Sequence, residues 1–128
     1  GTILVSEDGN SWAPRPSGTA STLLDVRYVD GQFVAVGMGG TLLTSPDGHE
    51  WTTRSTGTDL VLADVEFGDG RYLVVGEEGV ALTSTDGRTW TALPSATQTW
   101  LSGVAHGPQG FLAVGLSGTV VQWTGGAR

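Results

Sequence analysis

The sequence predicts an all-β fold built from repeated units of four short antiparallel strands. Three observations carry this prediction. The 128-residue chain repeats every 39 residues, and its copies open at Gly1, Gly40, Gly79 and Gly118. Runs of roughly five β-prone residues alternate with Gly- and Asp-rich turn signals. No window has a sustained apolar period of 3.6 residues, so we expect essentially no helix.

The repeats divide the chain into three full copies and one partial copy. They span 1–39, 40–78, 79–117 and 118–128, and we expect them to form a single segment, 1–128. One four-stranded unit begins in the second copy and ends in the third, and it contains four strand signals in order. Its β-prone runs are 60–67, 71–75, 80–84 and 89–93, separated by turns at 68–70, 76–79 and 85–88.

The residue types at the predicted turns explain why the chain reverses direction there. Asp30-Gly31 and Asp69-Gly70 occupy equivalent positions, and Asp-Gly suits a turn that needs positive φ. The third copy has a different turn signal there, at 107–110. The Gly-x-x-Gly segments join two strands and open no helix. We therefore interpret them as hairpin turns and not as phosphate-binding loops.

A motif of the form S-x-D-G-x-x-W occurs once in each full copy, at the turn between the third and fourth strand signals of a four-stranded unit. A short acceptor side chain beside Gly stabilises a turn, and the Trp buries area on the following strand. We interpret the motif residues as structural. They are Ser6, Asp8, Trp12, Ser45, Asp47, Trp51, Ser84, Asp86 and Trp90.

One four-stranded unit cannot bury both of its faces, so such units stack radially as the blades of a β-propeller. The motif resembles the Asp-box, or BNR, repeat of sialidase-like propellers. The wider pattern L-x-D-V…G-x-F-V-A-V-G is similar to propellers of the photosystem II assembly-factor type. The resemblance implies that Asp8, Asp47 and Asp86 accept backbone N–H bonds in the turn between the third and fourth strands of a blade. It does not identify a function.

The blade count predicts a partner. With strands labelled A to D outward, the chain reads C-D, A-B-C-D, A-B-C-D, A-B-C, so strand C occurs at both 1–5 and 118–122. About three blades cannot close a ring, which takes about four or more. We expect a homo-oligomer, with a dimer favoured, in which a second copy completes six blades. The alternative is a fragment of a larger propeller.

Composition excludes several classes of function. The net charge of −7 disfavours nucleic acid as a partner. The apolar runs are too short for a membrane span. The absence of Cys excludes disulfides and thiolate metal sites. Two isolated histidines, His49 and His106, have no metal-ligand spacing, so we expect neither a metal nor another cofactor.

The residues also argue against catalysis. Sialidases hold a carboxylate with three arginines, whereas Arg27 is the single Arg on an inner strand here. We expect no enzymatic activity. Residues that depart from the repeat are better candidates for ligand binding. Asp25 and Asp64 share one inner-strand position, which is Gly103 in the third copy. The candidate ligand-binding residues are Trp100, His106, Asp25, Asp64, Arg27 and Glu66.

Each candidate also has a structural interpretation. Asp25 and Asp64 can bond neighbouring backbone, and Trp100 can fill a gap between blades. We predict a non-catalytic scaffold or binding module for a protein or glycan ligand. The alternatives are a lectin-like carbohydrate-binding propeller, a fragment of a sialidase-like protein, and an engineered or ancestral-like propeller chain.

Overall fold

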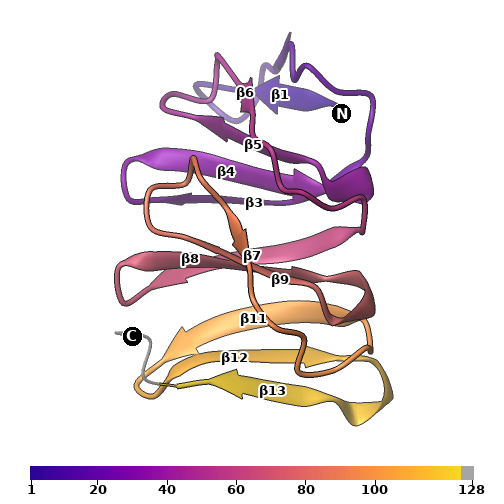
Figure 1. The fold of residues 1–128 in the computed structure, drawn as a ribbon. Coiled ribbons are helices and arrows are strands. Elements are labelled where there is room, and N and C mark those ends of the chain that lie inside the picture. The colour runs from indigo at the N-terminus through magenta and orange to yellow at the C-terminus, as the bar shows by residue number, and fades with distance from the viewer. Residues whose placement is uncertain (125–128) are drawn as a thin grey trace.

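The computed structural model is described for residues 1–124, and in that range it is an arc of stacked antiparallel sheets without an α-helix (Figure 1). The first sheet is a hairpin of two strands, which we call the N-terminal hairpin. Three further sheets follow, which we call blades 1, 2 and 3. The last four residues of the partial repeat, 125–128, lie outside the described residues.

The strands of each sheet follow one another in the chain. The N-terminal hairpin contains β1 (Ile3–Val5) and β2 (Ala13–Arg15). Blade 1 contains β3 (Leu23–Val29), β4 (Gln32–Gly37), β5 (Leu42–Ser45) and β6 (Thr52–Thr53). Blade 2 contains β7 (Leu62–Gly68), β8 (Arg71–Gly76), β9 (Ala81–Ser84) and β10 (Thr91–Ala92). Blade 3 contains β11 (Leu101–Gly107), β12 (Gly110–Gly115) and β13 (Val120–Trp123).

This order confirms the predicted series of two strands, two complete blades and three strands. The fourth strands are shorter than expected, because β6 and β10 each pair over two exposed residues. They form the outer edge of a blade, where a short strand limits the unpaired backbone. The two copies of strand C cover Ile3–Val5 and Val120–Trp123, and Gly118 belongs to the preceding turn.

The predicted turns adopt the backbone that their residues favour. Asp30 and Asp69 have φ of 56° and 52°, and each precedes a Gly with positive φ. The Gly-x-x-Gly segments form single 3-10 turns, η1 (Met38–Gly40), η2 (Glu77–Gly79) and η3 (Leu116–Gly118), between two antiparallel strands. They are therefore the hairpin connections that the sequence predicts.

The hydrophobic core lies between blades. Val34, Val36 and Leu42 of blade 1 pack against Val65 and Val74 of blade 2 in one buried cluster. An equivalent cluster joins blade 2 to blade 3, and its members are Leu73, Val75, Ala81, Leu101, Val104, Phe111 and Ala113. Each blade therefore depends on its neighbour for burial of its apolar side chains.

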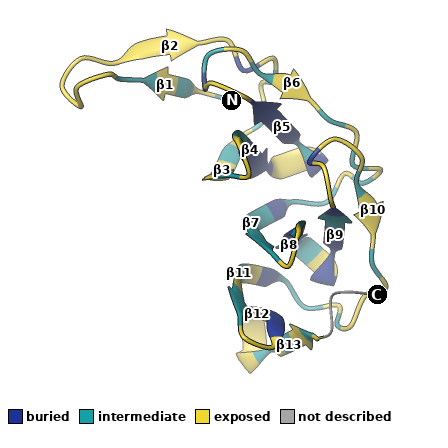
Figure 2. Ribbon diagram, turned by 90° about the vertical axis from the view of Figure 1, so that its left-hand side faces the viewer, coloured by how far each residue is buried: buried dark blue, intermediate teal, exposed yellow. Residues whose placement is uncertain are grey.

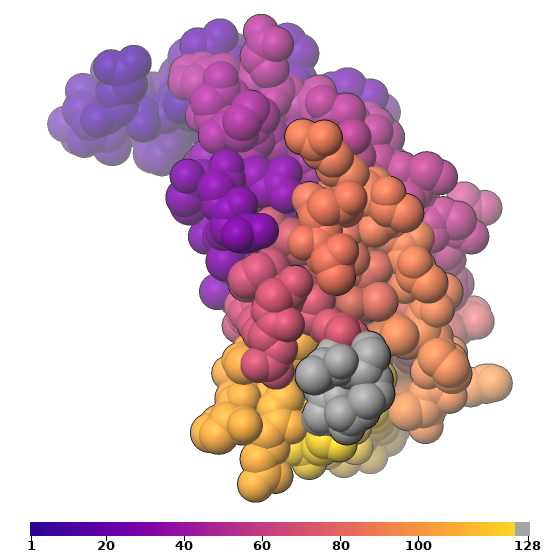
Figure 3. All heavy atoms as spheres, turned by 60° about the vertical axis from the view of Figure 1, so that its left-hand side comes forward, coloured from indigo at the N-terminus to yellow at the C-terminus, as the bar shows by residue number. Residues whose placement is uncertain are grey.

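The N-terminal hairpin stands apart from this stack. Figure 2 shows it reaching sideways beyond blade 1, and Figure 3 shows it as an indigo lobe at the end of the molecule. It lacks the two inner strands that every other sheet has. No helix within residues 1–124 has the length and apolar character needed to cross a membrane.

Candidate functional site

The innermost strands β3, β7 and β11 form a row, since β7 contacts both of the others. Each begins with a register shift, between Leu23 and Asp25 in β3 and at the equivalent positions of β7 and β11. A shift of this kind removes a residue from the pairing with the neighbouring strand. The residues that follow it are Asp25, Asp64 and Gly103.

The two aspartates tie each blade to the next. Asp25 Oδ2 accepts a hydrogen bond from Val65 N at 3.2 Å, and Asp64 Oδ2 accepts one from Val104 N at 2.8 Å. Asp64 Oδ1 also accepts from Val65 N at 3.0 Å. The carboxylates thus satisfy backbone groups across the inter-blade gap. Gly103 has no carboxylate, so this series of links ends at blade 3.

Asp25 and Asp64 also contact each other. The pKa of Asp25 is raised to about 6, mainly by burial and next by the hydrogen bond with Asp64, while the Val65 N–H opposes the shift. Glycosidases separate their two carboxyl groups by about 5 Å or more, with the sugar between them. A hydrogen-bonded pair that also holds backbone N–H groups has a different geometry, suited to joining strands.

Arg27 and Glu66 form a second link between blades 1 and 2. Their charged groups are 3.4 Å apart, with 42% of the Arg27 side chain and 19% of the Glu66 side chain exposed. Glu66 Oε1 also accepts from Phe67 N at 3.1 Å. Blade 3 has Ala105 at this position, so the pair occurs once. Arg27 retains exposed donors that a ligand can reach.

His106 and Trp100 lie at opposite ends of β11. His106 Nε2 is 2.9 Å from Asp69 Oδ2, a partner in the turn of blade 2 that the sequence analysis did not identify. The His106 ring lies so close to Gly68 that a Cβ there would meet it. Trp100 is half-buried, and its carbonyl accepts from Leu116 N at 3.0 Å. The six candidate residues therefore do not converge on one site.

The S-x-D-G-x-x-W turns have one hydrogen-bond pattern. Asp86 Oδ1 accepts from Arg88 N at 2.8 Å and from Thr89 N at 3.0 Å, and Asp8 and Asp47 accept from the equivalent pairs. Ser84 Oγ accepts from Gly87 N at 2.8 Å. These backbone donors lower the pKa of Asp86 to about 2 and also lower the pKa values of Asp8 and Asp47.

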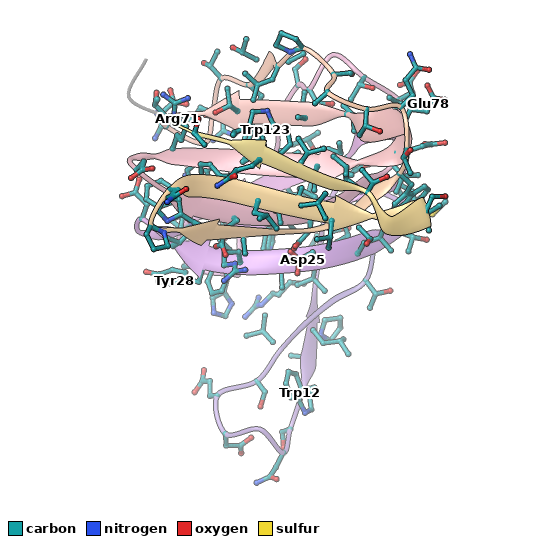
Figure 4. The ribbon with its side chains drawn as sticks, turned by 90° about the horizontal axis from the view of Figure 1, so that it is seen from below. Trp12, Asp25, Tyr28, Arg71, Glu78 and Trp123 are labelled. Carbon is teal, nitrogen blue, oxygen red and sulfur yellow. The ribbon has the colours of Figure 1, made fainter. Side chains whose placement is uncertain are left out.

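The indole groups of the motif differ between the sheets. Trp51 Nε1 donates to the Gly48 carbonyl at 2.9 Å, and Trp90 Nε1 donates to the Gly87 carbonyl at 3.0 Å. Among the described residues, Trp12 makes no such bond, and it is 58% exposed. Figure 4 shows Trp12 on the N-terminal hairpin, away from the stacked blades.

Both ends of the arc expose apolar faces. A groove of about 590 Å³ separates the N-terminal hairpin from blade 1, and its lining includes Ile3, Leu4, Trp12, Val26 and Phe33. At the other end, the open face of blade 3 exposes Leu112, Val114 and Val120. Such patches mark interaction surfaces. Nothing in the sequence distinguishes these faces, because the same residue types are buried in the middle of the arc.

Within residues 1–124, no three His, Asp or Glu side chains group closely enough to hold a metal ion. The row of inner strands, the radial blades and their inter-blade cores together define a partial β-propeller of about three blades. Solved structures of YCF48, a β-propeller, have the same fold. No protein-family model and no curated protein matches the chain.

Two of these structures show how far the likeness extends. One, YCF48 bound to D1 peptide, superposes with a TM-score of 0.74 at 24% identity, covering 92% of this chain and 41% of that one. The other, YCF48 from Cyanidioschyzon merolae, gives a TM-score of 0.78 at 17% identity, covering 99% of this chain and 45% of that one. The chain thus spans less than half the length of either structure, and the likeness concerns the fold.

Proposed function

We propose that the chain is a non-catalytic, protein-binding scaffold that completes a propeller ring with a second copy of itself. The observation that carries this proposal is the match between its two open faces. Val114 on blade 3 is 44% exposed, whereas Val36 and Val75 at the equivalent positions are fully buried. Blade 3 therefore presents the surface that blades 1 and 2 use to bind their neighbours.

Blade 1 presents the complementary surface. Val26 is 56% exposed, while the equivalent Val65 and Val104 are buried against the preceding blade. A second copy can thus repeat, between chains, an interface that occurs twice within the chain. Asp25 and Asp64 accept hydrogen bonds from backbone N–H groups of the next blade, and this supports a scaffold role over acid–base chemistry.

A protein ligand is supported by the neighbouring fold and by the inner strands. The YCF48 propeller binds a D1 peptide. In this chain, the row of inner strands carries Arg27 with 42% of its side chain exposed, in a molecule whose net charge is −7. A cation on this row suits carbonyl or carboxylate groups of a peptide segment.

The association is tested by sedimentation velocity of the 128-residue chain at two widely separated concentrations. We expect a species of twice 13.2 kDa at the higher concentration. Val114→Glu should return the protein to the single-chain mass. Met38→Glu is the matched control, because Met38 is 46% exposed in η1, outside both faces, and blade 2 has Glu77 at that position. A folded protein of 13.2 kDa at every concentration would contradict the ring.

Ligand binding is tested separately, by fluorescence anisotropy with a labelled D1 peptide and its scrambled counterpart. We expect saturable binding of the D1 peptide that weakens in Arg27→Ala and is unchanged in Arg88→Ala, a turn residue. Equal signals from the two peptides would overturn the protein-binding part of the proposal and leave the ring intact.

A further inference from the structure

Both complete blades contain the same aromatic pair. A ring from the second strand packs beside the Trp of the S-x-D-G-x-x-W motif, with centroids 6.1 Å apart for Phe33 and Trp51 and 5.7 Å apart for Tyr72 and Trp90. At the ends of the arc this pair is divided. Blade 3 has the second-strand ring, Phe111, and the N-terminal hairpin has the motif ring, Trp12.

Trp123 occupies the vacant place beside Phe111. The two residues are paired across β12 and β13, and Trp123 packs against the buried cluster that contains Phe111. Phe111 is consequently 3% exposed. In the complete blades, the position of Trp123 is held by Ser45 and Ser84, whose hydroxyls organise the turn into the fourth strand. Trp123 packs against the cluster that contains Phe111 but has no hydroxyl with which to begin that turn.

The strand β1 is followed by the serine that begins the turn into a fourth strand, and β13 has no such serine. Ile3, Leu4 and Val5 are equivalent to Val120, Val121 and Gln122, and Ser6 follows them in the position of Trp123. The Ser6 turn is already formed, since Ser6 Oγ accepts from Gly9 N at 2.7 Å and Asp8 Oδ1 accepts from Asn10 N at 2.8 Å. It leads into β2, a ready fourth strand.

We propose that, when two copies associate, the N-terminal hairpin of one copy replaces β13 at the outer edge of β12 in the other. Trp12 then takes the place of Trp123 beside Phe111. The inference rests on the proposed ring and identifies the strand that each copy gives up. The exchange adds a fourth strand and the aromatic pair of a complete blade, at the cost of the four residue pairs between β12 and β13.

Cysteine pairs test the exchange, because the chain has no Cys of its own. Leu112 pairs with Gln122 within the chain, and the equivalent of Gln122 in β1 is Val5. Directly paired residues in antiparallel strands lie within disulfide reach. After mild oxidation, we expect Val5→Cys/Leu112→Cys to give a disulfide-linked dimer on a non-reducing gel. At a protein concentration where the dimer predominates, Leu112→Cys/Gln122→Cys should remain unlinked, as should Leu112→Cys alone.

Two single variants add a second readout. Trp12→Ala should weaken dimerisation in sedimentation, and Trp123→Ala should strengthen it, each by about two- to tenfold in the dissociation constant. If the protein dimerises but the Leu112–Gln122 pair becomes linked within one chain, or Trp123→Ala weakens association, β13 stays in place and the exchange is wrong. A protein that never dimerises would instead refute the proposed ring.

Discussion

The middle and the ends of the arc place identical residues in different environments. Val75 in blade 2 is fully buried, and Val114, one repeat later, is 44% exposed. Val65 is fully buried, and Val26, one repeat earlier, is 56% exposed. The difference shows that burial in this chain is a property of the neighbouring blade and not of the residue. The apolar face of a terminal blade is therefore buried only when another blade of the same kind packs against it.

The polar contacts show the same contrast. Asp25 and Asp64 join successive blades through backbone N–H groups, and Gly103 offers no equivalent bond. The interface between blades 1 and 2 also contains Tyr72, whose hydroxyl donates to the Val29 carbonyl at 3.1 Å. Phe111 holds that position between blades 2 and 3. Blade 3 is held to blade 2 by the Val104–Asp64 and His106–Asp69 contacts and by the apolar cluster between these blades.

The largest effect is expected from truncating an equivalent pair of leucines. Leu73 is 2% exposed and Leu112 is 40% exposed. Leu73→Ala should lower the free energy of unfolding by about 3 kcal/mol, because it opens a cavity between blades 2 and 3. Leu112→Ala should cost about 1 kcal/mol or less in dilute protein. Urea denaturation followed by circular dichroism measures both.

Leu73→Ala and Leu112→Ala also distinguish the middle of the arc from its end when the protein concentration is raised. If a second copy covers blade 3, the cost of Leu112→Ala should grow with concentration, while the cost of Leu73→Ala should not. A Leu112→Ala cost that is already as large as that of Leu73→Ala in dilute protein would contradict the distinction between middle and end.

A smaller effect is expected at Tyr72. Its hydroxyl also accepts a hydrogen bond from Gln32 Nε2 at 3.2 Å. Tyr72→Phe should lower the free energy of unfolding by about 1 kcal/mol, because the Val29 carbonyl loses its donor in a buried interface. Tyr28→Phe is the control, since Tyr28 is 58% exposed. Equal denaturation midpoints for the two variants would show that the Tyr72 hydroxyl contributes nothing to the joint between blades 1 and 2.

A further effect is a pH dependence centred on Asp25. Its pKa is raised from 3.8 to about 6, so the folded state binds the proton more tightly than the unfolded state. The resulting stability is fully present below pH 4 and is lost as pH rises through 6. Asp25→Asn should remove this part of the pH dependence. The melting temperature of the wild type should therefore fall relative to that of the variant between pH 4 and pH 8.

The exposed Asp59 provides the control for this measurement. Asp59→Asn should follow the wild type across the same range. Parallel melting curves for Asp25→Asn and the wild type would mean that the pKa of Asp25 is not raised in the folded protein.

The sequence predicts the blades because their signals are local. Asp30-Gly31 and Asp69-Gly70 identify turns, and the S-x-D-G-x-x-W spacing identifies the hairpin that follows the third strand. Contacts across blades were harder to predict. The bond from Val65 N to Asp25 depends on a register shift at the start of each inner strand, and the shift has no distinct residue signal.

The candidate ligand-binding residues were also hard to place from local sequence signals. Trp100 and His106 depart from the repeat, but departure alone does not place residues together. They stand at opposite ends of β11, and His106 finds its partner in Asp69 of the preceding blade. The open faces were missed for a related reason, because Leu112 and Val114 match their buried counterparts in the sequence.

The hydrogen bonds between blades also bear on the entropic cost of adding a further blade to the chain. The Val65–Asp25 and Val104–Asp64 contacts each span 40 residues, whichever blade they join. Loop-closure entropy depends on that span, so forming the next interface costs the chain no more than forming the last one. An in-frame duplication of one repeat in the gene would therefore lengthen the arc without introducing a slower folding step. Selection could then act on blade number independently of blade sequence.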